Sequence, residues 1–391
     1  MRSRRTGLVT AACAVALLLA GIWLGGHPRD LPGPIRDAFV EDDRALHAEL
    51  VNAIEGNFYK KVDEKKLDDA SLKGMVESLH DPYSNYLTPK EAGEEREAVS
   101  GQFEGVGMNV AQDDRGLKVL EVFEGSPASR AGIRDGDLIV AVNGRSIAGL
   151  DSNVATARIR GKSGTSVRLD VLTPKDKRTR TVSVKRERIE VPVARGRIVE
   201  RDGRKLAVVE LASFSQGAHG LLRAEIDRLL KKGAEGIVLD LRGNPGGLLT
   251  EGVLVSSIFI EDGRVVSVRG RERPDHVYDA EGDAIAKNVP VVVLVNGGSA
   301  SAAEIVTGAL RDRHRAVVVG TRTFGKGLVQ ELEDLSNGGV LKLTVANYYL
   351  PGGETIGHSG IKPQVPAKDD PDTARDEALP VALDTLAKRV Q

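Results

Sequence analysis

The sequence predicts an α/β core preceded by a smaller β-rich domain and an N-terminal helical segment. After about residue 190, short runs of valine, leucine and isoleucine alternate with amphipathic stretches, which is typical of a layered α/β sheet. Between residues 101 and 188 the apolar runs are separated by Gly, Asp and Asn, as in an antiparallel β domain. Before residue 98, apolar residues recur at helical spacing.

Length and composition indicate a globular protein with more than one domain. A chain of 391 residues is too long for one ordinary core, and 41% hydrophobic with 28% charged residues excludes disorder throughout. The 55 basic and 56 acidic residues leave a formal charge of −1, which gives no global electrostatic reason to expect a nucleic acid partner. The single cysteine, Cys13, excludes an intrachain disulfide, a Cys-rich zinc site and a Cys-x-x-Cys motif.

Residues 1–26 predict export from the cytoplasm. Arg2, Arg4 and Arg5 precede an uncharged stretch over residues 7–26, the arrangement of a signal peptide or a signal-anchor. Cleavage and anchoring both stay open. We therefore expect the rest of the chain in the periplasm, the cell envelope or the extracellular space, with membrane contact only through residues 7–26 if they are not removed.

A Pro- and Gly-rich linker over residues 27–35 leads into the helical region, residues 36–98. Two amphipathic helices are expected there, ending near Asp81-Pro82. Their apolar positions are Leu46, Leu50, Val51, Ile54 and Phe58, followed by Leu72, Met75, Val76 and Leu79. These faces serve either internal packing or a homo-oligomer formed through the helices.

The β-rich domain and the core have distinct expected elements. In residues 101–188 we expect strands at 118–123, 137–142 and 166–172, a hairpin at Asn143-Gly144, and a short helix at 154–160. In the core, residues 190–366, buried strands and helices alternate along the chain. Strands are expected at 206–211, 236–241, 290–295 and 316–320, and helices at 221–230, 248–260 and 300–310. Residues 367–391 form a short, Asp-rich C-terminal tail.

Two Gly-rich segments stand where a core strand meets a helix, the place where α/β folds carry their sites. The first, residues 242–247, has the sequence Arg-Gly-Asn-Pro-Gly-Gly. Its glycines allow backbone N–H groups to turn inward as an oxyanion hole requires, although a simple tight turn would look the same. It lacks the features of a nucleotide-binding loop.

The second segment, residues 296–304, places two serines at the start of a helix. A serine there is exposed next to unpaired helix N–H groups, which suits a nucleophile. Ser301 and Glu304 also have the spacing of a capping box, so a purely structural role for Ser301 is an equal alternative.

Lys326 is the candidate base for such a serine. The seven histidines are scattered, and none lies in a setting typical of a Ser-His-Asp enzyme. Lys326 stands between two glycines and next to Phe324 in an apolar stretch, and burial can keep a lysine neutral enough to accept a proton. A solvated lysine in a turn is the alternative.

Four ordered motifs resemble those of the carboxy-terminal processing peptidases, the S41 serine peptidases with a PDZ domain. They are Asp-Pro-Tyr-Ser-Asn-Tyr-Leu-Thr-Pro at residues 81–89, Leu-Arg-Gly-Asn-Pro-Gly-Gly at 241–247, Ser-Ala-Ser-Ala-Ala-Glu-Ile at 299–305 and Phe-Gly-Lys-Gly-x-Val-Gln at 324–330. The resemblance extends from the N-terminal helices to about residue 366. It implies an α/β core of the crotonase-like ClpP/S41 type with an inserted PDZ domain.

The resemblance also implies roles for individual residues. Ser301 would be the nucleophile, Lys326 the base, and Gln330 the residue that orients the lysine amine. The family's oxyanion hole maps to the backbone N–H groups of Gly247 and Ala302. Asp312 matches an acid that some members use, and it is left out of the catalytic set. No metal or cofactor is implied.

The β-rich segment resembles a circularly permuted bacterial PDZ domain. Its carboxylate-binding loop maps to Gly105, Val106, Gly107 and Met108, where a substrate C-terminus would bind as an added strand. Met108, Val110 and Ile159 are expected as pocket walls, with core packing as the alternative.

These observations predict an exported serine endopeptidase that captures the C-terminus of a protein or peptide on its PDZ domain. A catalytically silent PDZ scaffold is the alternative function. Two other catalytic arrangements also stay open: Ser299 as the nucleophile with Ser301 as the helix cap, and a PDZ protease that depends on a histidine. The substrate, the need for an adaptor, and whether the PDZ domain inhibits or activates stay open.

Overall fold

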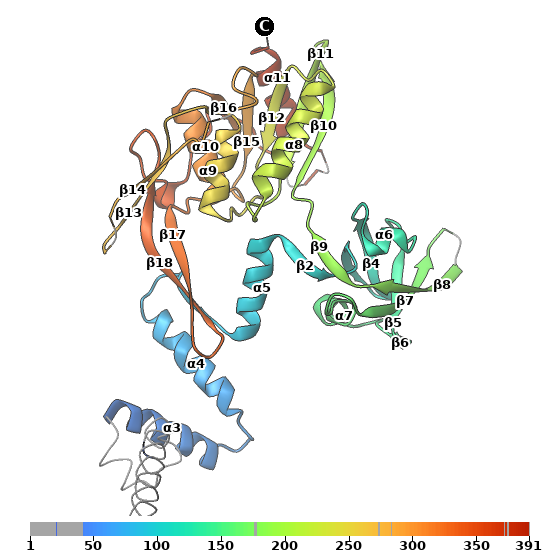
Figure 1. Cartoon of the computed structure of the whole chain (residues 1–391), viewed down its shortest axis with the longest axis vertical. Coiled ribbons are helices and arrows are strands. Elements are labelled where there is room, and N and C mark those ends of the chain that lie inside the picture. Colours follow the sequence, from blue (N-terminus) through green and yellow to red (C-terminus); the bar gives the residue numbers. More distant parts are fainter. Residues whose placement is uncertain are drawn as a thin grey trace, which may run out of the picture. The chain divides into compact units, whose positions relative to one another are not determined.

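The computed structural model of the chain describes Gly21 and residues 42–175, 178–272, 274–282, 284–370, 372–373 and 375–390. The expected signal segment and linker, residues 1–35, lie outside these residues apart from Gly21. The chain divides into two compact units, residues 1–88 and 89–391 (Figure 1). Across the described parts of the chain, we find no helix with both the length and the apolar character needed to cross a bilayer.

The first unit contains the two expected helices. α3 spans Asp42–Asn57 and α4 spans Glu64–Glu77, followed by the short strand β1, Asn85–Leu87. Asp63 caps α4, because its side chain accepts the Lys65 N–H at 3.1 Å. Within α3, Val51 is buried, whereas Leu46 and Leu50 are 64% and 58% exposed. The expected apolar faces are therefore only partly covered.

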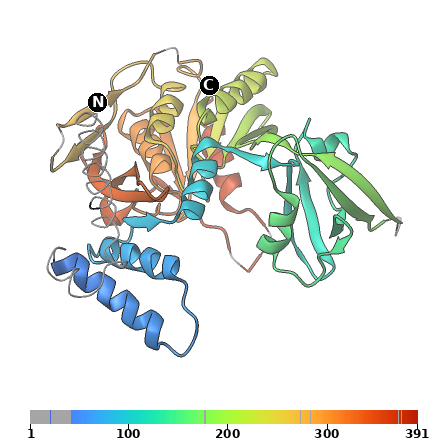
Figure 2. The same cartoon turned by 60° about the horizontal axis from the view of Figure 1, so that its bottom comes forward.

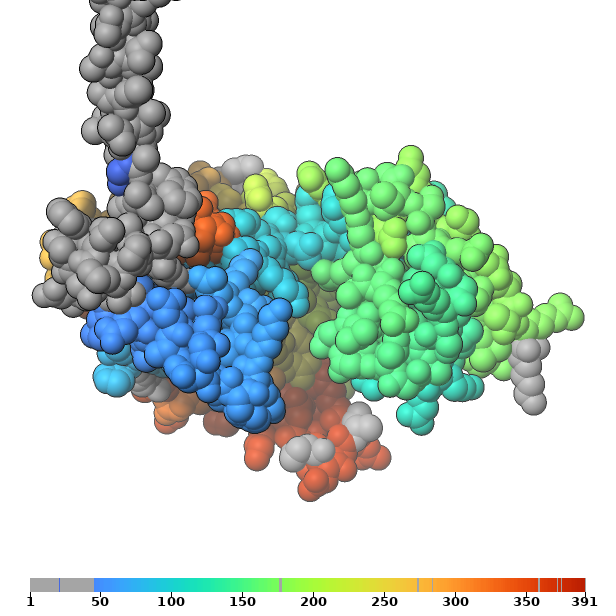
Figure 3. All heavy atoms as spheres, turned by 90° about the horizontal axis from the view of Figure 1, so that it is seen from below, coloured from blue at the N-terminus to red at the C-terminus, as the bar shows by residue number. Residues whose placement is uncertain are grey.

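The β-rich domain begins the second unit, after helix α5, Pro89–Ser100. Its strands are β2 (Gln102–Gly105), β3 (Met108–Asp113), β4 (Gly116–Val122), β5 (Leu138–Val142), β6 (Arg145–Ser146), β7 (Ser166–Thr173), β8 (Arg178–Lys185) and β9 (Glu187–Glu190), with helices α6 (Pro127–Arg130) and α7 (Ser152–Ile159). Its main sheet has the order β3-β4-β5-β7-β8, in which β3 is an edge strand. Figure 3 shows this domain in green as a rounded body.

The Asn143-Gly144 hairpin is confirmed. β5 pairs with β6 in antiparallel register, and both turn residues have positive φ, 51° for Asn143 and 76° for Gly144. Two successive residues of positive φ make the type I′ turn that joins tightly paired strands.

The core is a sheet with the order β10-β11-β12-β15-β16-β19. Its strands are β10 (Ala194–Arg201), β11 (Arg204–Leu211), β12 (Gly236–Asp240), β15 (Val291–Val295), β16 (Ala316–Gly320) and β19 (Val365–Pro366). β10 is antiparallel to β11, and the remaining neighbours are parallel. Buried valines and leucines fill both faces of the central strands, as the continuous apolar runs predict.

Helices cover both faces of this sheet. Ile237 and Leu239 of β12 pack into one apolar cluster with α8 (Ala218–Lys231), α9 (Leu249–Ser257) and α10 (Ala302–Asp312). Figure 2 shows α9 and α10 side by side on this face. Val238 points to the other face, where it packs against α11, Ala378–Ala387. The segment expected as a short tail thus contributes a helix to the core.

A second, antiparallel sheet stands beside α9 and α10. It contains β13 (Arg264–Gly270), β14 (His276–Asp279), β17 (Leu328–Asp334) and β18 (Val340–Tyr349). β13 lies between β14 and β18, and β17 pairs with β18 (Figure 1). The lysine loop, residues 321–327, connects β16 of the first sheet to β17 of the second.

Candidate active site

A cavity of about 420 Å³ lies where both Gly-rich junctions meet the lysine loop. Four of the residues expected from the sequence line it: Gly247, Ser301, Lys326 and Gln330. Apolar walls come from Leu248 and Leu249 at the start of α9 and from Val329 and Leu332 on β17. No histidine of the described residues lines this cavity, whereas Lys326 does, together with Ser301.

Ser301 has an unusual backbone conformation. It is the N-cap of α10 with φ 54° and ψ −116°, and it is only 6% exposed. A non-glycine residue with positive φ is uncommon, and such conformations gather at functional sites. Its N–H donates to the Glu304 carboxylate at 3.0 Å, the backbone part of the capping box that the spacing predicts.

Glu304 connects the serine to the lysine loop. This fully buried carboxylate accepts four hydrogen bonds. Oε2 accepts the N–H groups of Ser301 and Lys326, at 3.0 and 2.8 Å. Oε1 accepts the Thr323 hydroxyl and the Gly325 N–H, at 2.5 and 2.8 Å. This one side chain therefore fixes the backbone of the candidate nucleophile relative to the backbone of the candidate base.

The other serine, Ser299, has different surroundings. It is fully buried, donates from Oγ to the Leu241 carbonyl at 2.7 Å and accepts the Asn296 N–H at 3.0 Å. The bond to Asn296 lies within the serine junction, whereas the bond to Leu241 reaches the start of the first Gly-rich junction. Because Ser299 does not line the cavity, these bonds give it a structural role.

The first junction packs directly against Ser301. A Cβ on Gly246, whose φ is 95°, would lie 2.8 Å from the Ser301 Cβ, so a side chain has no room there. Buried Asn244 shapes the loop, since its Oδ1 accepts the Gly246 N–H at 2.8 Å and its carbonyl accepts the Ala300 N–H at 2.9 Å. Within the described chain, the N–H groups of Gly247 and Ala302 donate to no acceptor.

The lysine loop differs in two respects from the expectation. Phe324 is 55% exposed and does not bury Lys326, which is half-buried. Lys326 also lies before β17, and a bulge separates Val329 from Gln330. Lys326 therefore does not lie on the strand that carries Gln330, although both residues line the cavity. The Gln330 Nε2 donates to the Thr344 hydroxyl at 3.3 Å.

Two further features were missed by sequence reasoning. The Tyr348 hydroxyl forms a hydrogen bond with the Ser301 side chain, and burial raises the pKa of Tyr348 to about 12 although this hydrogen bond acts in the opposite direction. The Lys342 ammonium pairs with Glu95 at 2.6 Å, and both line the cavity. Nothing in the sequence around β18 points to either contact, because both join segments distant along the chain.

Asp312 lies at the far end of α10 from Ser301. Its carboxylate pairs with Arg311 at 2.8 Å and accepts the Gly352 N–H at 3.0 Å, and it does not line the cavity. These contacts give Asp312 a structural role, consistent with leaving it out of the catalytic set.

The expected peptide-binding loop closes the β-rich domain next to its edge strand. The Val106 and Gly107 carbonyls accept the N–H groups of Ala128 and Phe123, at 2.8 and 3.1 Å. Because C=O and N–H point in opposite directions across a trans peptide, the N–H groups of Gly107 and Met108 face away from these donors. Ile159 is buried in the domain core, and Met108 and Val110 pack half-buried against it, while Gly105 ends β2.

Three family models match the chain. Residues 205–367 match the peptidase family S41 model, residues 118–173 a PDZ domain, and residues 47–91 the activating protease CtpB N-terminal domain. The PDZ match lies within the expected β-rich domain, and the N-terminal match lies within the expected helical region. The S41 match lies within the expected core except for its last residue, 367.

Known bacterial proteins are similar to most of this chain. The carboxy-terminal processing protease CtpA of Bacillus subtilis is 40% identical over 316 residues, which cover 81% of this chain and 67% of that protein. A "Probable CtpA-like serine protease" of Staphylococcus aureus is 38% identical over 339 residues, 86% of this chain and 66% of that protein. The chain spans about two thirds of the length of these relatives. An S41-type protein from Bacteroides fragilis, 19% identical, has the same fold with a TM-score of 0.54 over 88% of this chain and 98% of that one.

Proposed function

Because the chain belongs to the PDZ-containing C-terminal processing peptidases of family S41, which are serine-type endopeptidases, we propose that it hydrolyses peptide bonds with a Ser301–Lys326 dyad. The observation that carries this proposal is the shared Glu304 oxygen, which accepts the N–H groups of both residues beside a common cavity.

In the proposed mechanism, the lysine amine serves as base and then as acid. Lys326 Nζ takes the proton of Ser301 Oγ while Oγ attacks the carbonyl carbon of the scissile peptide. The N–H groups of Gly247 and Ala302 donate to the developing oxyanion, and the lack of another acceptor for either supports this role. Lys326 then gives the proton to the leaving amine, and water releases the acyl group from Ser301 by the same steps. Gln330 helps to orient the lysine.

Substitution and covalent labelling test the dyad. Ser301→Ala and Lys326→Ala are expected to abolish turnover of an unstructured peptide, and Ser301→Ala is expected to abolish labelling by a fluorophosphonate. Ser299→Ala is the matched control, because the Ser299 hydroxyl bonds only backbone groups outside the cavity. The fluorophosphonate label of this variant must map to Ser301. Turnover that survives either dyad substitution would refute the assignment, and a wild-type chain without turnover would favour a silent PDZ scaffold.

For substrate selection we propose that the PDZ domain binds free protein C-termini as an added strand on β3. Support comes from the edge position of β3, which leaves one side of the strand unpaired within its sheet. The N–H groups of Gly107 and Met108 would donate to the terminal carboxylate. The full-length Ser301→Ala chain should bind a peptide with a free C-terminus at least about tenfold more tightly than its amidated form, since charge-assisted hydrogen bonds are the stronger ones. Equal affinity would refute carboxylate recognition.

For location we propose export directed by residues 1–26. The basic start followed by an uncharged apolar stretch supports this assignment. Expression with a C-terminal tag, cell fractionation and N-terminal sequencing test it. A product in the cytoplasmic fraction that still begins at Met1 would refute export, and the N-terminus of the exported product distinguishes a cleaved signal from an anchor.

A further inference from the structure

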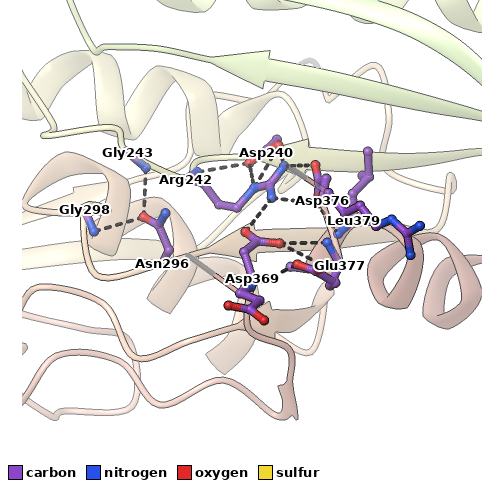
Figure 4. A network of polar contacts seen from close by, with 12 residues as sticks. Asp240, Arg242, Gly243, Asn296, Gly298, Asp369, Asp376, Glu377 and Leu379 are labelled. Atoms are coloured by element: carbon purple, nitrogen blue, oxygen red, sulfur yellow. Dashed lines mark hydrogen bonds and ion pairs between the residues drawn. The ribbon is translucent and has the colours of Figure 1, made fainter. Parts of the chain in front are cut away.

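The Arg242 side chain is surrounded by three carboxylates at the start of the first Gly-rich loop. Arg242 follows β12 after one residue, Leu241, and its side chain is 18% exposed. Its Nη2 and Nε bond the Asp240 carboxylate at 2.7 and 3.0 Å, and its two Nη atoms bond the Asp376 carboxylate at 2.9 Å each. Asp369 accepts from Nη1 at 3.2 Å (Figure 4).

Two of these carboxylates come from the C-terminal segment, beyond residue 367 where the match to the S41 family model ends. Asp369 Oδ1 also accepts the N–H groups of Glu377 and Ala378, and Asp376 Oδ1 accepts that of Leu379. The same carboxylates therefore hold Arg242 and satisfy the first N–H groups of α11. The apolar face of α11 anchors the segment, because Ala382 and Leu386 are fully buried against the sheet.

On its other side, the loop that begins at Arg242 is fastened to the serine junction. The Asn296 side-chain oxygen accepts the N–H groups of Gly243 and Gly298, at 2.9 Å each (Figure 4). Further along, Gly246 packs against Ser301. Between these contacts the loop reaches Gly247, the proposed oxyanion donor. A change in the position of Arg242 would therefore be transmitted to that N–H group.

We propose that Asp369 and Asp376 are positioning residues of the active site, which hold the oxyanion loop, residues 242–247, through Arg242. This inference rests on the proposed role of Gly247. It extends the catalytic unit to the C-terminal segment, whose carboxylates hold the guanidinium on the side opposite Asp240. Loss of one or both leaves Arg242 paired with Asp240 and α11 anchored by its apolar face. The chain then stays folded while the loop loses its outer support.

The test compares the double variant Asp369→Asn/Asp376→Asn with Asp372→Asn, a control that removes one charge from the same segment without a contact to Arg242. Removal of an oxyanion-hole donor lowers kcat by about 10²–10³. In the double variant the Gly247 N–H is displaced and not removed. We therefore expect kcat to fall by about tenfold, and KM to stay within about twofold of the wild-type value. The Ki of a peptide aldehyde, whose adduct oxygen occupies the oxyanion hole, should rise by the same factor. The control should match the wild type.

A conservative variant separates positioning from a general loss of structure. Asp376→Glu keeps the carboxylate, so kcat should recover toward the wild-type value relative to Asp376→Asn, while the melting temperatures of the two variants stay similar. Unchanged kcat and Ki in the double variant would overturn the inference, and so would a fall in kcat that only follows the fraction of unfolded protein. Ser301→Ala in the same assay tests the dyad separately. Residual turnover of that variant would refute the dyad. The change in aldehyde Ki between the double variant and the wild type would then still test the role of the C-terminal segment.

Discussion

Glu304 is the residue on which the relation between Ser301 and Lys326 depends most. Twenty-five positions separate these two residues along the chain, and the four hydrogen bonds of one buried carboxylate bring their backbones together. The capping-box spacing in the sequence predicts the bond to Ser301. It does not predict that the same carboxylate also binds Thr323, Gly325 and Lys326, since those contacts require a particular packing of the loop against α10.

Glu304→Gln is expected to lower both activity and stability. In either orientation the amide nitrogen would face at least one N–H donor, that of Gly325 or those of Ser301 and Lys326. An unsatisfied buried group costs about 1–3 kcal/mol. We expect kcat to fall by at least about 100-fold, because displacement of either dyad residue by an ångström can cost that much.

Glu251→Gln is the matched control for this variant. Glu251 is also a buried carboxylate in the first turn of a helix, and it accepts the N–H groups of Gly217 and His219, at 2.8 and 2.9 Å. Urea unfolding should show comparable destabilisation of the two variants, with the larger loss of kcat in Glu304→Gln. Near wild-type kcat in Glu304→Gln would contradict the role given to this carboxylate.

Tyr348→Phe removes a hydrogen bond to the nucleophile and leaves the ring in place. A net hydrogen bond is worth about 1 kcal/mol, so we expect kcat to fall roughly fivefold with KM unchanged. Steady-state kinetics check this expectation. Tyr349→Phe is the control, because Tyr349 is the neighbouring residue on β18 and does not line the cavity. Equal kcat values for Tyr348→Phe and the wild type would argue against a catalytic contribution of this hydroxyl.

The pKa of Tyr348 predicts an alkaline effect on stability. Burial raises this pKa from 10.0 to about 12, so the folded state retains the phenol proton where the unfolded state releases it. The resulting stabilisation is complete below pH 10 and is lost as pH rises from about 10 through 12. Urea unfolding at pH 9 and 11 should therefore show a smaller decline for Tyr348→Phe than for the wild type. Parallel declines would contradict this prediction.

At the scale of elements, α11 changes the interpretation of the C-terminal segment. The Asp-rich composition suggests a solvated tail, yet α11 buries Leu383 and Leu386 against the sheet. The sequence signal is weak because only one face of a short helix is apolar, and its N-terminal N–H groups bond to carboxylates at Asp369 and Asp376. Whether such a segment docks depends on the sheet face left uncovered by α8, α9 and α10.

Leu386→Ala should show that α11 belongs to the folded core. Truncation of a fully buried leucine costs about 2–5 kcal/mol, and Leu386 has no exposed surface. Chemical denaturation of the full chain measures the change. Thr385→Ala lies on the same helix, where its hydroxyl bonds only the Val381 carbonyl at 2.7 Å, and it should cost less. Equal, small effects of both substitutions would indicate that α11 does not stabilise the core.

At the scale of the whole molecule, α3 and α4 have large apolar side chains that the described part of the chain leaves exposed. Leu46, Leu50 and Met75 are 64%, 58% and 68% exposed. Figure 3 shows atoms of these helices, in blue, on the face in view. Exposed apolar surface of this kind favours association, and we expect homo-oligomers formed through the helices.

Leu46→Ser/Leu50→Ser should weaken that association. Each buried leucine contributes about 1.5–3 kcal/mol, so the dissociation constant should rise by at least about tenfold. Light scattering coupled to gel filtration over a concentration series measures the shift. Glu49→Ser, an exposed polar position on the same helix, is the control. A monomeric wild type at all concentrations would refute oligomerisation through these helices.

The sequence by itself determined the order of parts, the alternation of strands and helices in the core, the Asn143-Gly144 turn and the family, because these depend on local periodicity, turn chemistry and short motifs. The tertiary structure alone decided that Glu304 joins the serine to the lysine loop, that Tyr348 contacts Ser301, and that Phe324 is exposed. It also decided that α11 packs on the core sheet and that Asp369 and Asp376 bind Arg242. Each of these features depends on how segments far apart in the chain pack against one another, which local sequence patterns do not encode.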